Sequence, residues 1–212
     1  MKILFLTDSL SLPRDGKDEK VFYEDTYPYL LKKKYKEIDF VFLGIGGATA
    51  TDLYRQSSYY KGLNADLVFL QCGIVDCAPR PFRKTESIII KKLKLRFLFK
   101  PLVKFLTKYR NYRYSSPSRF NKSTKRIKQN AFADVSMYSI GILPASNEYE
   151  KKLPGIIKSI NKYNNILKRN YDFIDTSDIP FDGILSDHHH LNKKGHLIIF
   201  NKLTSIINKH KV

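Results

Sequence analysis

The sequence predicts a three-layer α/β/α sandwich built on a parallel sheet of about five strands. Short apolar runs alternate along the chain with segments of helical periodicity, which is the pattern of a parallel sheet covered by helices on both faces. Several of these runs end in polar or glycine-containing tips, such as Thr7-Asp8-Ser9 after the first run. With 212 residues, 42% of them hydrophobic, the chain suffices for one such domain.

The predicted strands are short and mostly apolar, as expected of strands buried on both faces. They cover residues 3–6, 39–43, 66–70, 136–143 and 171–175. Helical spacing of apolar residues predicts helices over residues 22–36, 51–60, 153–169 and 195–209. Pro28 and Pro154 fit this assignment, because proline is tolerated in the first turn of a helix.

Residues 82–130 interrupt the alternation and carry most of the charge. They contain 16 Lys and Arg against one acid, whereas the rest of the chain has 22 basic and 19 acidic residues. We expect residues 88–106 to form a basic amphipathic helix interrupted at Pro101, and residues 111–125 to form a flexible loop. The prediction is therefore one domain over residues 1–212, with 82–130 as a basic helical and loop insertion.

The formal charge of +18 and a pI near 9.8 first suggest a nucleic-acid partner. That partner is not predicted, because the body is nearly neutral and no recognised nucleic-acid motif accompanies the basic segment. Interleaved apolar residues in 82–130 favour an anionic membrane surface or a charged glycan. Packing of the apolar stripe on the body is the alternative. Compositional drift in an AT-rich genome, which the many Lys, Asn and Ile residues would fit, is a second explanation of the basicity.

Cysteine content and hydropathy bear on location. Two cysteines, Cys72 and Cys77, exclude a disulfide framework and lack the spacing of a zinc site. No apolar run approaches the roughly 20 residues of a membrane span, and no secretory signal is evident. We expect a cytoplasmic protein, with the basic segment allowing a peripheral position on the inner membrane face.

Three residues from opposite ends of the chain could form a nucleophilic site. Ser9 follows the first strand, and Asp187 and His190 lie three residues apart, so one turn can place both on one side. A serine needs a base to take its proton and an acid to orient that base. Taken separately, Ser9 could be a helix cap and the Asp/His pair a surface turn.

The histidines near Asp187 could alternatively bind a metal ion. His188, His189, His190 and His196 supply nitrogen ligands, but adjacent histidines point in different directions. No second ligand cluster stands elsewhere in the sequence. We therefore predict neither a metal nor a cofactor.

Four stretches resemble motif blocks of the SGNH, or GDSL, hydrolases. They are Thr7-Asp8-Ser9-Leu10, Gly44-Ile45-Gly46-Gly47-Ala48-Thr49, Gly73-Ile74-Val75-Asp76, and Asp187-His188-His189-His190-Leu191-Asn192 with the trailing Gly195. The resemblance covers most of the chain except residues 82–130, and the first and last blocks together are its most specific part. It implies the flavodoxin-like sheet of that family.

The resemblance also implies roles for individual residues. Ser9 would be the nucleophile, His190 the general base and Asp187 the group that orients it. The oxyanion hole would use the backbone N–H of Ser9 and of Gly47, with Gly46 as the neighbouring alternative, because an unhindered backbone can approach the acyl oxygen closely. The candidate substrate-binding residues are Asp8, Gln71, Asp76 and Arg80.

Two positions depart from the family pattern. Thr7 replaces the first glycine, and Val75 replaces the asparagine that gives a third oxyanion donor. Valine has no side-chain donor, and the loss of one such donor costs roughly 3–4 kcal/mol in another hydrolase. Gln71 or Arg80 could supply a donor instead. Otherwise the protein is a slow enzyme or none at all.

The stretch over residues 73–80 is similar to SGNH proteins of bacterial surface-polysaccharide clusters. The expected function is therefore hydrolysis of an ester, chiefly O-acetyl on a carbohydrate. One alternative is acyl transfer by the same three residues, with a sugar hydroxyl in place of water. The other is a non-catalytic protein that retains the fold and binds glycan or membrane.

Overall fold

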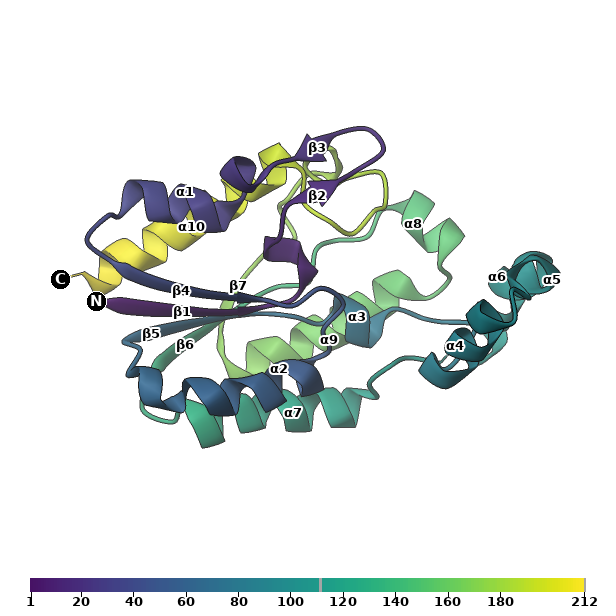
Figure 1. Ribbon diagram of the computed structural model, residues 1–212, viewed down its shortest axis with the longest axis horizontal. Coiled ribbons are helices and arrows are strands. Elements are labelled where there is room, and N and C mark those ends of the chain that lie inside the picture. The colour runs from purple at the N-terminus through teal and green to yellow at the C-terminus, as the bar shows by residue number, and fades with distance from the viewer. Residues whose placement is uncertain (111, 212) are drawn as a thin grey trace.

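The centre of the molecule is a parallel sheet of five strands (Figure 1). The strands are β1 (Lys2–Thr7), β4 (Asp39–Gly44), β5 (Leu67–Gln71), β6 (Ser136–Ile140) and β7 (Asp172–Ile174), in the order β4-β1-β5-β6-β7. The computed structural model describes residues 1–110 and 112–211. Every pairing within this sheet is parallel. The fold class predicted from the sequence is confirmed.

β1 is the inner strand on which the sheet is organised. Its residues 3–6 are fully buried, and Phe5 stacks between Phe42 and Phe69 at ring-centroid distances of 4.7 and 4.8 Å. Thr7 lies in register with Gly44 of β4 and with Gln71 of β5. Three strand ends therefore meet at one edge, at the point where the strand order reverses, which is where such sheets bind ligands.

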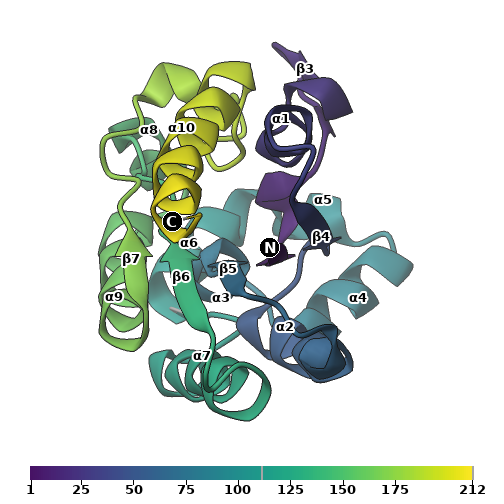
Figure 2. The same ribbon diagram turned by 90° about the vertical axis from the view of Figure 1, so that its left-hand side faces the viewer.

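Helices cover both faces of the sheet (Figures 1 and 2). On one face lie α1 (Tyr27–Lys34) and α10 (Lys193–His210); on the other lie α2 (Ala50–Ser57), α7 (Pro117–Ala131) and α9 (Ile156–Asn170). Shorter helices are α3 (Ile74–Cys77) and α8 (Asn147–Lys152), and a small hairpin pairs β2 (Arg14–Asp15) with β3 (Lys20–Val21). Five 3₁₀ turns complete the described part: Ser9–Ser11, Tyr23–Asp25, Ser58–Leu63, Lys100–Leu102 and Phe181–Gly183.

The predicted helices form with shifted ends. Residues 22–36 give a 3₁₀ turn followed by α1, and residues 153–169 become α9 only from Ile156. The late start of α9 has a local cause. Gly155 before it has a φ of +88°, and the Glu150 carboxylate accepts hydrogen bonds from the N–H groups of Gly155 and Ile157. That carboxylate therefore caps the start of α9. The chain bends just before this helix, and the Leu153-Pro154 pair alone does not predict the bend.

The predicted flexible loop over residues 111–125 is wrong from Pro117 onward. Ser116 caps α7 by accepting a hydrogen bond from Arg119 N–H, and Pro117 occupies the first turn. One face of this helix is buried, and the helix packs against α2 and α9. Its buried residues are Phe120, Ser123, Thr124 and Ile127. The second half of the segment 82–130 therefore belongs to the core.

The first half of that segment extends away from the body (Figure 1). We call residues 82–110 the helical projection; it contains α4 (Lys84–Lys92), α5 (Arg96–Phe99) and α6 (Val103–Arg110). The predicted helix breaks at Pro101, as expected, and also at Lys94, whose φ is +54°. In the described residues, no helix is both long enough and apolar enough to cross a bilayer.

Helix α7 and the helical projection should differ in how much stability the protein loses when an aromatic ring is removed from them. Phe120 of α7 is fully buried against Tyr163, so Phe120→Ala removes a packed side chain and should lower the free energy of unfolding by about 3–5 kcal/mol. For a chain of this size that corresponds to a fall in melting temperature of roughly 6–20 °C.

The matched control is Phe105→Ala in the helical projection, where the ring is 55% exposed. Its melting temperature should stay within about 2 °C of the parent by thermal denaturation. Equal effects at the two positions would contradict the assignment of α7 to the core.

Candidate active site

Ser9 begins a 3₁₀ turn directly after β1. The turn forms because the Asp8 carboxylate accepts a hydrogen bond from Leu10 N–H at 3.0 Å, and Leu12 N–H bonds back to Ser9 C=O. The Ser9 side chain is thereby fixed at the carboxyl edge of the sheet and is only 7% exposed. A serine that caps a helix would use its oxygen on the backbone, whereas here Asp8 does the capping and leaves Ser9 Oγ available.

Asp187 and His190 sit in a tight loop before α10. The loop is closed by a hydrogen bond from Leu185 N–H to His190 C=O at 2.8 Å, and His188 adopts a φ of +68°. Asn192 holds the exit of the loop. Its side chain accepts from Gly195 N–H and donates to Asp182 C=O.

Gly195 is required by close packing at the same place. A Cβ added to it would lie 2.2 Å from Gly183 C=O, so only glycine lets α10 start this close to the preceding turn. The block from Asp187 to Gly195 is thus held together by hydrogen bonds and close packing.

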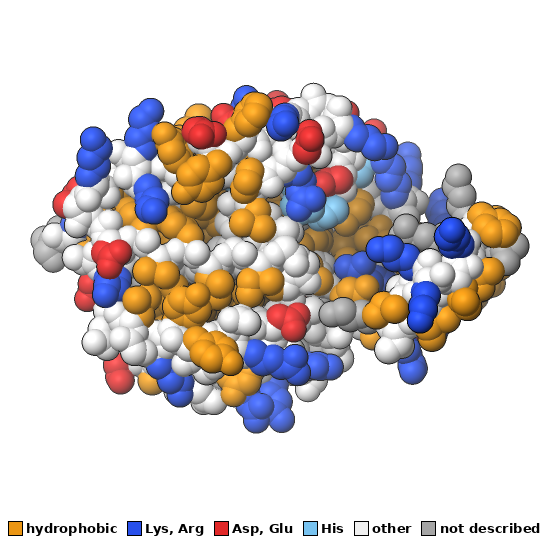
Figure 3. All heavy atoms as spheres, viewed as in Figure 1, with side chains coloured by type: hydrophobic (Ala, Val, Ile, Leu, Met, Phe, Trp, Pro, Cys, Tyr) orange, Lys and Arg blue, Asp and Glu red, His pale blue; other side chains and the backbone are white. Residues whose placement is uncertain are grey.

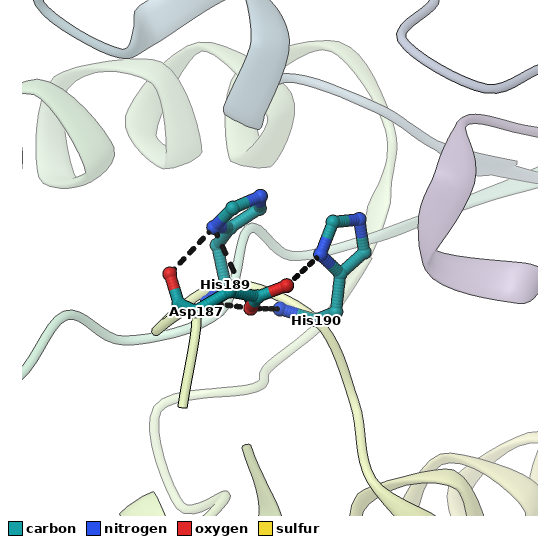
Figure 4. Close-up of side chains that lie close together, drawn as sticks. All are labelled: Asp187, His189 and His190. Atoms are coloured by element: carbon teal, nitrogen blue, oxygen red, sulfur yellow. Dashed lines mark hydrogen bonds and ion pairs between the residues drawn. The ribbon is translucent and has the colours of Figure 1, made fainter. Parts of the chain in front are cut away.

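The three predicted residues are in hydrogen-bonding contact. Ser9 Oγ lies 2.9 Å from His190 Nε2, and His190 Nδ1 lies 2.6 Å from Asp187 Oδ2 (Figure 4 shows the Asp187 side of this contact). An ionised carboxylate can only accept, so His190 carries its proton on Nδ1. Nε2 is then the acceptor for the Ser9 hydroxyl, which is the tautomer a general base needs.

Asp187 is held in the ionised form. Burial acts to raise its pKa, but the hydrogen bond from His190, the nearby His189 and the backbone N–H groups outweigh burial and leave the pKa well below the usual value. Asp187 Oδ1 accepts from the N–H groups of His189 and His190 at 3.1 and 3.0 Å. The carboxylate therefore stays charged and fixed through the neutral pH range.

The glycine loop after β4 is positioned beside Ser9. Ile45 N–H donates to Thr7 C=O at 3.0 Å, which ties this loop to the end of β1. Gly46 and Gly47 follow at the exposed rim, and a Cβ at either would meet nothing within 4 Å. Gly47 has a φ of +71°. Within residues 1–110 and 112–211, neither glycine N–H has a protein acceptor, so both are available to an incoming oxygen.

A cavity of about 540 Å³ opens over Ser9 and His190. Figure 3 shows a hollow with apolar side chains inside it and histidine at its edge. The lining residues are Ser9, Arg14, Gly46, Gly47, Ile74, Val75, Ala78, Pro79, Arg80, Pro81, Tyr114, Tyr149, Leu153, His189 and His190. This volume is in the usual range for a small-molecule site.

The candidate substrate-binding residues separate into two groups. Arg80 lines the cavity, whereas Asp8, Gln71 and Asp76 are fully or almost fully buried and do not. Gln71 Oε1 accepts from the Tyr27 hydroxyl at 2.7 Å, and among the described residues its Nε2 has no partner. Their positions favour a supporting role for these three rather than contact with substrate.

Asp76 connects the segments around the cavity. Its carboxylate accepts from Ala50 N–H at 2.9 Å and from Ser115 Oγ at 2.5 Å. It thus joins the start of α2, the turn after β5 and the chain leading into α7. Burial raises the pKa of Asp76 to about 6, and burial raises that of Asp8 to about 7.

Four polar side chains of the cavity were not assigned to the active site from the sequence. Arg14 comes from β2, Tyr114 precedes α7, Tyr149 comes from α8, and His189 lies between two members of the Asp187 block. Arg14 and Tyr149 sit on elements without a sequence signal. Of these four residues, only His189 lies within a motif block. The sequence alone does not show which way its side chain points.

The histidines do not form one cluster. His196 is buried between α1 and α10, accepts from Tyr27 N–H, and has its pKa lowered by burial to about 4. His188 stacks on Tyr149 outside the cavity lining. Asp187, His189 and His190 do offer ligand atoms within 4.8 Å of one another (Figure 4). Both nitrogens of His190 already have protein partners, so a metal would have to displace one of them.

No family model matches the sequence, and no curated protein is significantly similar to it. Solved structures do match. A lipase/acylhydrolase from Enterococcus faecalis is 14% identical with a TM-score of 0.69, covering 99% of this chain and 96% of its own.

Two further structures show the same likeness. A lipolytic protein of the G-D-S-L family from Veillonella parvula is 13% identical, with a TM-score of 0.63 and 98% of each chain covered. A catalytic mutant of an acetylxylan esterase from Geobacillus stearothermophilus is 17% identical, with a TM-score of 0.62 over 95% of this chain and 91% of that one. The chain therefore has the fold of the SGNH, or GDSL, hydrolases.

Proposed function

We propose that this protein is a serine esterase that removes O-acyl groups, chiefly O-acetyl, from a carbohydrate. The observation that carries the proposal is the continuous contact from Asp187 through His190 to Ser9 at the floor of an open cavity. Each group is in the state that nucleophilic catalysis needs: an ionised acid, a base with a free acceptor nitrogen, and a serine hydroxyl directed at it.

The proposed reaction has two halves. Ser9 Oγ attacks the ester carbonyl carbon while its proton passes to His190 Nε2, and the N–H groups of Ser9 and Gly47 face the developing oxyanion. The bond to the sugar oxygen breaks, and His190 gives the proton to that oxygen. Water then attacks the acyl-enzyme through the same base, releasing the carboxylic acid and restoring Ser9.

Hydrolysis is favoured over transfer to a second sugar. The cavity opens on the face shown in Figure 3, and Ser9 is one of its lining residues, so water can enter the site. Acyl transfer requires water to be kept from the acyl-enzyme. A non-catalytic role is disfavoured, because a protein that only binds glycan has no need of an aligned Ser9, His190 and Asp187.

A carbohydrate substrate is supported by two observations. The acetylxylan esterase from Geobacillus stearothermophilus, named for an acetylated glycan, has the same fold. The cavity far exceeds the size of an acetyl group, so most of it is left for the alcohol part of the ester. Within that class we propose a bacterial surface glycan or its precursor, because residues 73–80 resemble proteins of surface-polysaccharide clusters.

We further propose that the helical projection holds the protein against an anionic membrane surface, as a peripheral cytoplasmic protein. Eight of the 14 exposed large apolar side chains in the described residues lie in it. They are Ile88, Ile89, Leu93, Phe97, Leu102, Val103, Phe105 and Tyr109. Its single acid, Glu86, is already paired with Arg110 at 2.8 Å, which leaves the exposed lysines unopposed.

Replacement of the nucleophile should abolish turnover. Ser9→Ala should lower kcat for p-nitrophenyl acetate by roughly 10⁴-fold or more, because the three residues act as a unit. A fluorophosphonate probe should add one adduct to the parent by intact mass and none to Ser9→Ala.

Ser11→Ala is the matched control, since Ser11 lies in the same turn and bonds to Thr7 rather than to His190. It should retain the adduct. Equal turnover by Ser9→Ala and the parent would refute the proposed mechanism.

Val75→Asn should raise the acylation rate by roughly 10- to 100-fold. Val75 lines the cavity beside Ser9 and offers no donor, and the buried Gln71 does not reach the cavity. An asparagine there adds an oxyanion donor, whose value in another hydrolase is about 10²–10³ in kcat.

Pre-steady-state release of p-nitrophenol measures this step, and Val75→Ala controls for a change in size alone. An unchanged or lower acylation rate in Val75→Asn would mean that another group already supplies the donor. Arg80 is the cavity residue that could do so.

The helical projection should bind anionic liposomes at low salt. Each Lys or Arg near an anionic leaflet contributes about 1 kcal/mol, and the Debye length shrinks from about 10 Å at 0.1 M to about 3 Å at 1 M salt. Co-sedimentation should therefore fall with salt and should be lost when Lys91, Lys92, Lys94 and Lys104 are changed to Gln.

A body variant with the same charge change controls for net charge. In this variant the lysines at and just beyond the end of α1 are changed to Gln; they are Lys32, Lys33, Lys34 and Lys36. Its liposome binding should stay close to that of the parent. If the parent ignores anionic liposomes at low salt, the membrane proposal is wrong. Retention on acidic polysaccharide would then make the projection a glycan contact.

A further inference from the structure

Two guanidinium groups line the cavity without an acidic partner. Arg14 and Arg80 are each half-buried, and the Nε of each is fully buried with no hydrogen-bond partner in the described residues. Within that part of the chain neither forms a salt bridge, in contrast to Arg110 of the projection.

Both arginines lie on segments that are held in place by contacts with neighbouring parts of the chain. Arg80 is held by an antiparallel bridge to Tyr112, and its guanidinium carbon lies 4.1 Å from the centre of the Tyr114 ring. This contact with the ring helps to position the guanidinium, whose outer nitrogens can still pair with a ligand. Arg14 is held in the β2–β3 pair, opposite Val21.

The charge of the cavity is one-sided. Its lining contains two arginines but no Asp or Glu. Two carboxylates that adjoin lining residues in the sequence are already engaged: Asp187 bonds to His190, and Glu150 bonds to the N–H groups of Gly155 and Ile157. A half-buried guanidinium without an acidic partner is costly, so its presence in the lining of an open cavity favours an anionic ligand.

We propose that the substrate of this site is an acylated acidic sugar, whose carboxylate or phosphate is bound by Arg14 and Arg80. This inference rests on the proposed esterase function and names its substrate class. The anion belongs to the sugar rather than to the acyl group, because an acetyl group has no charge and fills only a small part of the 540 Å³ cavity. Arginine suits this task, since its planar fork pairs with two oxygens at once.

The test compares three mono-O-acetylated substrates: glucuronic acid, glucose 6-phosphate and glucose. For the parent, kcat/KM on at least one of the two charged sugars should exceed that on glucose by roughly 10- to 100-fold. Preference for the first or the second charged sugar distinguishes a carboxylate from a phosphate. Arg14→Gln and Arg80→Gln should each lower the ratio of charged to neutral substrate, and the double variant should bring it close to one.

Arg55→Gln is the matched control. Arg55 is an exposed arginine on α2, outside the cavity lining, so its loss changes the net charge equally and should leave the ratio unchanged. Using a ratio removes any general loss of activity, and Arg→Lys variants that keep part of the preference would show that charge at these positions matters. A parent ratio near one, or a double variant that keeps the preference, would overturn the proposal.

A binding measurement separates this inference from the proposed function. Calorimetry with the Ser9→Ala protein should show glucuronate or glucose 6-phosphate binding more tightly than glucose, with the difference lost in the Arg14→Gln/Arg80→Gln background. If the parent hydrolyses no ester yet binds the anionic sugar in this way, the esterase proposal fails and the anion site stands. If the parent hydrolyses neutral esters and binds no anion, the reverse holds.

Discussion

The parallel alignment of β1 between β4 and β5 is the constraint on which the site depends. Because all three strands run the same way, their carboxyl ends meet at one edge, and the hydrogen bonds from Asp8 N–H to Gln71 C=O and from Ile45 N–H to Thr7 C=O continue the pairing beyond the strands. The turn that carries Ser9 and the glycine loop are therefore extensions of the sheet. Their relative position is set by backbone hydrogen bonds rather than by side-chain packing, which gives the precision that acyl chemistry requires.

Beneath the carboxyl ends of these strands lies a layer of buried polar groups that do not line the cavity. Asp76 is the main one, because it ties α2, α3 and the approach to α7 through two charge-assisted bonds. Burying carboxylates is expensive, and the raised pKa values of Asp8 and Asp76 show that the cost is only partly offset by their donors. The family resemblance made these residues candidates for contact with substrate. Their burial instead favours a part in holding the contacting residues in place.

Features that depend on local sequence patterns were predicted. Features that depend on contacts between distant segments were missed. Short apolar runs sufficed for the strands, and the blocks around Ser9 and His190 sufficed to bring together two residues 181 positions apart. Helix α7 was missed because Ser123 and Thr124 occupy its buried face, which weakens the apolar periodicity around Phe120. Arg14 was missed because it carries no motif. Only the fold brings it to the cavity that also contains Arg80.

The proposed reaction site and the proposed membrane contact adjoin one another in this molecule. Pro81 lines the active-site cavity and also lines an apolar groove of the helical projection, together with Phe82 and Phe97. The chain thus passes directly from the cavity wall, at Arg80, into the basic apolar segment. A projection seated on an anionic surface would orient the cavity mouth relative to that surface, and the same positive field would draw in an acidic sugar before the two arginines bind it. The uneven charge of the sequence is then explained by two tasks at one end of the sheet.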